Sequence, residues 1–427
     1  MLGQFTRQLD PENLLSVANL SDAVWVAYVK LVPLSDDELQ ALKSECEDGP
    51  HRRLFAHNYA WSYTCIYRPN TEAEIRRELE PLRDTDFSRI YWETASGDRT
   101  RYPSKIGRMS TNEWVEDPYR VCDRLADESW REFARKGIDP LRVAVDYAHK
   151  IGLEFHASYR TAGFHFPVLE EEWTTGGLYD QHPEWRGRDR QGRPTPRLSY
   201  AYPEVRRFVI SLLKESAEYP IDGVCILYNR RPPLLDYEPP LVEVFRQKFG
   251  KDPRRLEERD PRWLAYRASY LTQFMREVRA AMDDVARKQG RKKHPEVSAI
   301  VMSSEAENLY FAMDVETWVR EGLIDTLIPY TSVKRLDPAD AKFFLKITQG
   351  TQCKMELNLM PRQLSPEEYR ARDHRLYNAG VENLFLRDTN GRSNFSRSWT
   401  VLRRLGHRDA IDAWVAADRA SRHRTKK

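Results

Sequence analysis

The chain has 427 residues, and its 41% hydrophobic content is enough to bury a large core, which excludes a disordered chain. Its 68 Lys and Arg nearly balance 65 Asp and Glu, so a formal net charge of +3 gives no general attraction to nucleic acid or to a membrane surface. No apolar run is long enough to span a bilayer. The first ten residues lack the apolar run of a signal peptide, but a leader could have been removed, so the location stays open. The oligomeric state stays open as well.

The first segment, residues 1–55, is expected to form a short helical extension. Ser35, Asp36, Asp37 and Glu38 precede an apolar-periodic stretch at 39–46, and this order is typical of a capped helix start. After Pro50 the pattern changes and is then kept to the end of the chain. We therefore expect the main domain to span residues 56–427.

That domain alternates short runs rich in β-branched and aromatic residues with segments of helical spacing, which is typical of parallel βα units. The expected strands are 59–67, 89–93, 153–159, 223–228, 297–303, 326–330, 353–359 and 383–386. The expected helices are 72–82, 140–151, 203–219, 263–288, 315–321, 338–346 and 366–378. Eight such units predict an α/β fold, a (β/α)8 TIM barrel.

Long connections follow the second, third and fourth expected strands, at 94–139, 160–202 and 230–261. In a TIM barrel, insertions at this end build the wall of the active site. A doubly wound sheet is the alternative, but the chain has no GxGxxG and no GxxxxGK[ST] pattern. No nucleotide cofactor, and no other cofactor, is therefore expected.

Metal and thiol chemistry find little support in the sequence. The five cysteines are widely spaced with no CxxC pair, and no HxH or HExxH spacing occurs, so no metal site is predicted. Ser303 and Ser304 lack a GxSxG elbow, which argues against a serine nucleophile.

Acidic side chains stand at or near the ends of several expected strands. In a barrel, the last inward-pointing residues face the ligand. Cleavage of a glycosidic bond needs two carboxyl groups, one that protonates the leaving oxygen and one that attacks or activates water. The candidate catalytic residues are Glu305, Glu356, Asp388 and Glu93. The alternative is that these acids only pair with arginines in a structural network.

Glu305 is the first choice as general acid, because it follows a strand of apolar and small residues where burial would raise its pKa. Aromatic residues could stack on sugar rings. These are Tyr67, Trp92, Tyr159, Tyr228 and Tyr330. Polar residues could hold hydroxyl groups, and their many arginines suggest an acidic or sulfated glycan. These are His156, Arg160, Asn229, Arg230, Arg231, Asn358, Arg387 and Asn390.

Several ordered blocks resemble the family-ten-like glycosyl hydrolases, a group distinct from the xylanases of similar name. The blocks are HPEW at 182–185, LSYAYPEVR at 198–206, IDGV at 221–224 with Arg230 and Pro232, and MDVETWVREGLID at 313–325. The resemblance implies a TIM barrel that acts on or binds polysaccharide, often in bacteria that degrade complex glycans. Members commonly carry an Asp at the end of the fourth strand, where this chain has Leu227.

We therefore expect a glycoside hydrolase with a carbohydrate substrate. The missing fourth-strand Asp leaves a non-catalytic sugar-binding barrel as the alternative. A lyase or isomerase that uses His156 or Lys354 as base is a third reading.

Overall fold

The computed structural model describes residues 33–46, 49–111, 121–166, 174–230, 232–360, 364–387 and 398–424. The chain divides into two units, Met1–Glu47 and Asp48–Lys427. The described part of the first unit holds one helix, α1 (Asp36–Cys46), whose start carries the expected cap. Ser35 Oγ accepts a hydrogen bond from the Glu38 N–H at 3.3 Å, and the Ser35 N–H donates to Glu38 Oε2 at 2.8 Å.

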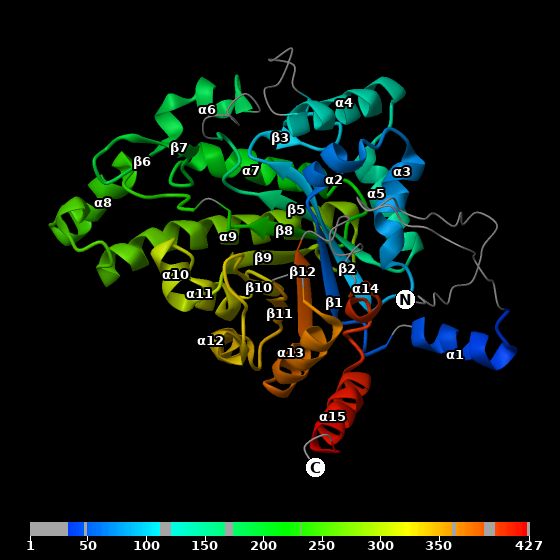
Figure 1. Cartoon of the computed structure of the whole chain (residues 1–427). Coiled ribbons are helices and arrows are strands. Elements are labelled where there is room, and N and C mark those ends of the chain that lie inside the picture. The colour runs from blue at the N-terminus through cyan, green and yellow to red at the C-terminus, as the bar shows by residue number, and fades with distance from the viewer. Residues whose placement is uncertain are drawn as a thin grey trace. The chain divides into compact units, whose positions relative to one another are not determined.

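The second unit is a closed barrel of eight parallel strands, as the sequence predicts (Figure 1). Around the barrel the order is β1, β2, β5, β8, β9, β10, β11 and β12, and β12 pairs back to β1. The strands are β1 (Leu54–Asn58), β2 (Phe87–Ser96), β5 (Glu154–Arg160), β8 (Gly223–Leu227), β9 (Glu296–Met302), β10 (Thr326–Tyr330), β11 (Lys354–Asn358) and β12 (Asn383–Arg387).

The expected first strand, residues 59–67, is wrong. That segment is the helix α2 (Ala60–Tyr67), and the strand β1 precedes it. Its aromatic and β-branched residues are typical of a strand, but in the structure they belong to a helix that packs against its neighbours. Tyr63 packs edge-on against Trp92 with ring centroids 5.3 Å apart, and α2 also lies against α4 (Val121–Lys136). Tertiary packing here overrides local propensity.

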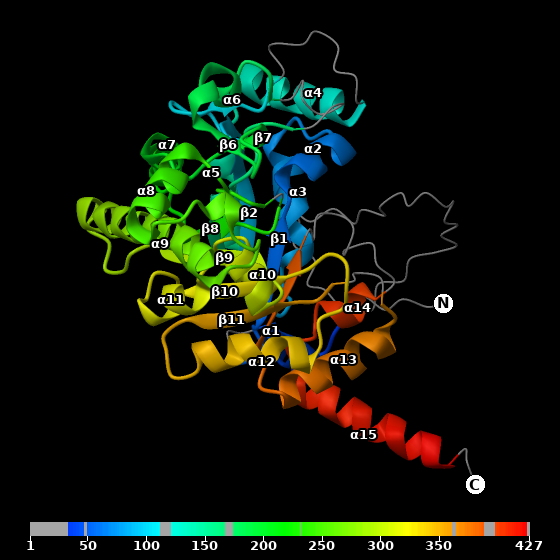
Figure 2. The ribbon, with the colours of Figure 1, turned by 90° about the vertical axis from the view of Figure 1, so that its left-hand side faces the viewer.

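The expected helices are confirmed, with ends that differ by a few residues. Several begin with proline in the first turn, where a missing N–H costs nothing. They are α3 (Glu72–Leu79) with η1 (Glu80–Leu82), α5 (Pro140–Lys150), α7 (Pro203–Ser216), α9 (Pro261–Gln289), α11 (Val315–Arg320), α12 (Pro338–Thr348) and α13 (Pro366–Asn378). These helices surround the strands (Figure 2).

The three long connections contain regular elements that the sequence did not predict. The first connection holds β3 (Arg99–Thr100), β4 (Arg108–Met109) and α4. The second holds α6 (Leu178–Gln181), η3 (Pro183–Trp185), β6 (Arg186–Arg188) and β7 (Pro194–Leu198). The third holds α8 (Pro239–Phe249) and η4 (Pro253–Arg255). Three further helices were not expected: α10 (Glu305–Tyr310), α14 (Trp399–Leu402) and α15 (Arg408–Arg424), the last packed on α13.

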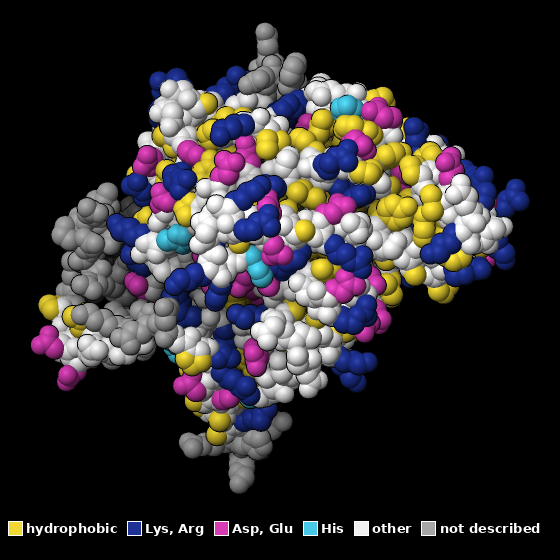
Figure 3. All heavy atoms as spheres, turned by 180° about the vertical axis from the view of Figure 1, so that it is seen from behind, with side chains coloured by type: hydrophobic (Ala, Val, Ile, Leu, Met, Phe, Trp, Pro, Cys, Tyr) yellow, Lys and Arg dark blue, Asp and Glu magenta, His cyan; other side chains and the backbone are white. Residues whose placement is uncertain are grey.

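Two apolar clusters follow from the alternation of side chains along each strand. The larger cluster joins the outer faces of the strands to the helices. The smaller lies inside the barrel and includes Phe55, Tyr91, Leu227, Ile300 and Phe385. Acidic and basic side chains are interspersed over the face seen in Figure 3, in keeping with the nearly balanced charge. Among the described residues, no helix is long and apolar enough to cross a membrane.

Candidate functional site

The floor of the barrel interior is organised around one buried arginine, Arg89 near the start of β2. Its side chain is 3% exposed and donates to Glu154 Oε2 at 2.6 Å and to Glu296 Oε2 at 2.7 Å. It also lies 3.7 Å from Glu356 Oε1 and donates to the Tyr91 hydroxyl at 3.2 Å. Arg89 therefore ties the first residues of β5 and β9 to the middle of β11.

Glu356 and His156 belong to this closed interior. Glu356 is fully buried, and its Oε1 accepts a hydrogen bond from the Tyr91 hydroxyl at 2.9 Å. Burial raises the pKa of Glu356 to about 8, against the opposing attraction of Arg89. His156 is also fully buried and shares a hydrogen bond of 3.2 Å with Ser298 Oγ. Burial lowers the pKa of His156 well below its usual value, and the charge of Arg89 adds to this.

The two residues were expected at the ligand end of the barrel, and the structure places them elsewhere. Both point inward as expected, but each lies in the middle of its strand, not at the end. Only the last inward residue of a strand reaches the C-terminal face. Glu356 and His156 thus present no surface to solvent.

The C-terminal ends of the strands gather a different set of side chains, which we call the mouth. It is lined by His57, Tyr59, Glu93, Arg101, Arg160, Arg230, Tyr330 and Arg387. His57 and Arg387 pair directly in the register of β1 and β12, so they lie on the same side of the sheet. His57 is fully buried, and burial lowers the pKa of its ring well below the usual value, with the charges of Arg387, Arg230 and Arg101 acting in the same direction.

Glu93 is the one predicted carboxylate that the described structure places in the mouth. It is fully buried, and its Oε1 forms an ion pair of 2.8 Å with Arg101 Nη2. Arg101 follows β3 and reaches back over the end of β2. The structural reading of Glu93, an acid neutralised by an arginine, therefore has direct support.

The predicted arginines of the mouth lie against aromatic rings. Arg160, the last residue of β5, donates to the Tyr59 hydroxyl, and its guanidinium stands 5.2 Å from the centroid of Phe166. Arg387, the last residue of β12, stands 4.8 Å from the ring centroid of Tyr330. Tyr330, the last residue of β10, thus lies at the mouth beside Arg387. Burial lowers the pKa of Arg230, and the charges of Arg160 and Arg387 lower it further.

Two predicted amides also occupy strand ends. Asn358 ends β11 and donates from Nδ2 to the Thr331 carbonyl at 3.1 Å, while its buried Oδ1 accepts no hydrogen bond from any described residue. Asn229 follows β8, and both polar atoms of its side chain are buried without a hydrogen bond in the described part of the chain. Such amides can take hydroxyl groups of a ligand.

The four predicted carboxylates do not form one described cluster. Glu305 begins α10 after β9 and is exposed, so the burial expected around it is not found. Glu356 lies inside the barrel and Glu93 in the mouth. Asp388 lies outside the described residues, as do Asn390 and Arg231.

Three predicted aromatic residues point away from the mouth and pack behind the strands. Trp92 is 2% exposed and packs on Tyr63; Tyr159 donates from its hydroxyl to the Gly97 carbonyl at 2.9 Å; Tyr228 packs on Trp318 with centroids 5.3 Å apart. Trp92 and Tyr159 occupy outward positions of β2 and β5, and Tyr228 directly follows β8, so helix packing explains all three. Tyr67 is half-buried at the end of α2 against the same outer core.

Leu227, at the position where the family resemblance implies an Asp, is fully buried in the inner apolar cluster with Ile300 and Ile328. It pairs with Arg160 of β5 in the barrel register. Its other partner in the register is Ile300 of β9, so a side chain at this position lies between Arg160 and an apolar residue. Leu227 therefore belongs to the inner apolar cluster where that cluster meets the mouth.

Sequence reasoning missed three residues of the mouth: His57, Tyr59 and Arg101. His57 was missed because the first strand was expected to begin after it, and Tyr59 because it was taken as the first residue of that strand. Arg101 lies in a connection without a strong pattern. Sequence reasoning also missed Asp236 and Glu238, which lie between β8 and α8. Burial raises the pKa of Asp236 to about 6 and that of Glu238 to about 7. Glu238 accepts hydrogen bonds from the backbone N–H groups of Asp236 and Arg188, so it joins two loops.

One group of described residues has donors near enough to hold a metal ion: His51, Asp86 and His407, with ligand atoms within 4.8 Å of one another. Asp86 Oδ2 already accepts hydrogen bonds of 2.8 Å from the Gly406 N–H and from His407 Nδ1. Arg404 stands 3.5 Å from the other oxygen. A guanidinium at that distance disfavours a cation, and the group instead holds the C-terminal segment to the barrel floor.

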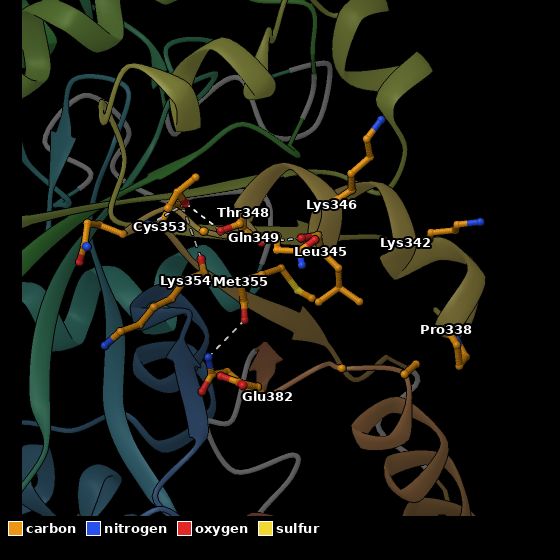
Figure 4. A pocket seen from close by; sticks show the side chains of 16 residues that line it. Pro338, Lys342, Leu345, Lys346, Thr348, Gln349, Cys353, Lys354, Met355 and Glu382 are labelled. Atoms are coloured by element: carbon orange, nitrogen blue, oxygen red, sulfur yellow. Dashed lines mark hydrogen bonds between the residues drawn. The ribbon is translucent and has the colours of Figure 1, made fainter.

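A separate hollow opens beside α12 and the first residues of β11 and β12, at the end of the barrel opposite the mouth (Figure 4). Lys342 and Lys346 extend away from it, and Asn383 Nδ2 donates to the Met355 carbonyl at 3.3 Å. Glu382 is the single carboxylate of its lining. This hollow therefore lacks the pair of acids that glycosidic cleavage needs. Lys354, considered above as a base, lies here and not at the mouth.

Solved structures similar to this chain include several glycosidases. An α-galactosidase from Thermus thermophilus matches at 13% identity over 83% of this chain and 61% of its own, with a TM-score of 0.42. An endo-β-1,4-mannanase from Thermotoga petrophila matches at 10% identity over 78% of this chain and 67% of its own, also at 0.42. An exo-β-N-acetylglucosaminidase from Vibrio harveyi matches at 10% identity over 74% of this chain and 42% of its own, at 0.37.

The chain thus spans less than two thirds of the Thermus and Vibrio proteins. No curated protein matches the sequence significantly. The family comparison is more extensive, because one family model covers residues 23–343, about three quarters of the chain, and confirms the resemblance found in the sequence. The protein belongs to the glycosyl hydrolase-like 10 family.

Proposed function

We propose that this protein is a glycoside hydrolase that binds an oligosaccharide or polysaccharide across the mouth of its barrel. The observation that carries the proposal is the gathering of polar and charged side chains from β1, β2, β5, β8, β11 and β12 at one end of the barrel. Ligands of TIM barrels bind at this end. The family membership and the buried, unsatisfied amides of Asn229 and Asn358 support the same place.

For the reaction we propose Glu305 as the proton donor and Asp388 as its partner. Glu305 follows β9 and is open to solvent, and Asp388 comes directly after Arg387, the last residue of β12. Both therefore follow strands that end at the mouth. Glu93 is a weaker candidate because Arg101 already pairs with it, and Glu356 is set aside because it is sealed in the interior.

Mass spectrometry of digests in isotopically labelled water tests this proposal. A panel of polysaccharides is incubated with the native protein and with Glu305→Gln and Asp388→Asn. Hydrolysis predicts products that each carry one labelled oxygen, and loss of an acid or base group predicts a rate lower by about 10²–10⁴-fold. Glu316→Gln, an exposed glutamate in the first turn of α11, is the matched control and should keep the native rate.

A non-catalytic carbohydrate-binding barrel is the second candidate. Two observations favour it: Leu227 is an apolar residue where the family resemblance implies an acid, and Glu93 forms an ion pair with Arg101. This candidate predicts that the native protein binds a glycan without releasing product, and that Glu305→Gln binds it equally well. Product carrying labelled oxygen that disappears in Glu305→Gln would exclude it.

A further inference from the structure

The mouth contains four guanidinium groups that come from four separate segments. Arg101 follows β3, Arg160 ends β5, Arg230 follows β8, and Arg387 ends β12. Arg101 and Arg160 share one aromatic neighbour, since each guanidinium carbon lies 5.9 Å from the ring centroid of Tyr59. Arg230 is close enough to both Arg160 and Arg387 for their charges to disfavour its own.

Several of these groups are deeply buried and retain hydrogen-bonding capacity. Arg101, Arg160 and Arg387 are only 4%, 3% and 5% exposed. Among the described residues, nothing accepts a hydrogen bond from Arg101 Nη1, Arg160 Nε or Arg387 Nη1. A buried donor without an acceptor is unfavourable, and more so when it is charged. Three such donors at one place are therefore available to a ligand.

The charges of the mouth do not cancel. Glu93 is the acidic group that faces these arginines in the described structure, and it pairs with Arg101 at 2.8 Å. His57, which faces Arg387, Arg230 and Arg101, is held neutral because its pKa is lowered well below the usual value. Among the described residues, no carboxylate forms an ion pair with Arg160, Arg230 or Arg387, and Glu93 acts on Arg230 only from a distance. Arginine is suited to carboxylate and sulfate groups because its planar fork presents paired donors.

We propose that the mouth binds a negatively charged saccharide, with Arg160, Arg230 and Arg387 around its carboxylate or sulfate group. This inference rests on the proposed function, since it names the class of ligand taken by the same site. Tyr59 and Tyr330 hold Arg160 and Arg387 in place, so little side-chain freedom is lost on binding. The rigid setting favours recognition of a fixed anionic group over loose attraction to any polyanion.

Pairs of glycans that differ only in charge test the proposal by isothermal titration calorimetry with the full chain. Oligogalacturonate is compared with its methyl ester, and sulfated chondroitin oligosaccharide with the desulfated form. We expect at least one charged member to bind about tenfold or more tightly than its neutral partner. The first pair reports on a carboxylate and the second on a sulfate. Equal affinity within both pairs would overturn the proposal.

Substitutions locate the effect. Arg160→Gln and Arg387→Gln should each weaken binding of the charged member by about tenfold and leave that of the neutral member nearly unchanged. Arg276→Gln, which removes an exposed arginine bonded to Glu321 on the helix layer, is the control and should bind as the native protein does. A loss as large in Arg276→Gln would contradict the assignment.

Two further measurements keep the test independent of variant folding. Arg387→Lys retains the charge but not the forked donors, so its affinity should fall between those of the native protein and Arg387→Gln. Binding of the charged glycan to the native protein should weaken as NaCl is raised, because the contacts are ionic. If neutral glycans bind and are hydrolysed at the mouth without preference for charge, the proposed function stands and this inference fails. If inorganic sulfate binds in an arginine-dependent way but no glycan does, the proposed function fails and the saccharide assignment fails with it.

Discussion

Replacing Glu356 by glutamine should make the protein more stable at neutral and alkaline pH. Burial raises the pKa of Glu356 to about 8 from an ordinary 4.5, so the folded protein keeps this proton while the unfolded chain releases it. Raising the pH from 5 to 8 therefore favours the unfolded chain and lowers stability. At pH 7 the difference between the two pKa values lowers the free energy of unfolding by at most about 3 kcal/mol. Glutamine does not titrate and can still accept from the Tyr91 hydroxyl.

Urea denaturation of the native protein and Glu356→Gln at pH 5, 6, 7 and 8 measures this difference. The free energy of unfolding of the variant should rise relative to the native value as the pH increases, by about 2–3 kcal/mol over the range. Glu316→Gln, in an exposed position, should follow the native curve throughout. A difference that stays constant from pH 5 to 8, or that grows in favour of the native protein, would refute the burial argument for Glu356.

Three further substitutions test other parts of the structure. Arg89→Met leaves the carboxylates of the barrel floor facing one another without their cation and should lower the free energy of unfolding by about 3 kcal/mol, as measured with urea. Trp92→Ala should destabilise the protein by about 3–5 kcal/mol, but calorimetry should find glycan affinity unchanged, because the ring packs behind the strand. Asp86→Asn should cost about 1–3 kcal/mol and increase proteolysis near His407, which it holds to the barrel floor.

The barrel could be predicted because its signal is repeated. Strands such as 326–330 and 383–387 are apolar runs bounded by turns, and the helices between them keep a helical spacing with proline or a cap at the start. The first strand could not be found in this way. Its five residues, Leu54–Asn58, are short, and the aromatic helix that follows them has a stronger strand pattern.

The direction of the side chains was easier to predict than their depth. Alternation correctly sends Glu356, His156 and Arg160 into the barrel, but pairing between strands decides that Arg160 lies at the mouth and Glu356 in the closed interior. How far an inward side chain lies from the C-terminal face depends on the stagger of neighbouring strands. This stagger leaves no pattern in the local amino-acid sequence. Arg101 shows the same limit, because it does not end a barrel strand. The short strand β3, which pairs antiparallel with the end of β2, brings it to Glu93.

A structure of the protein with a bound oligosaccharide would test the central claim most directly, that the ligand lies at the C-terminal end of the barrel. We expect the sugar to contact Arg160 and Arg387, with hydroxyl groups at Asn229 and Asn358. A saccharide bound instead in the hollow beside α12, with the mouth empty, would contradict the account.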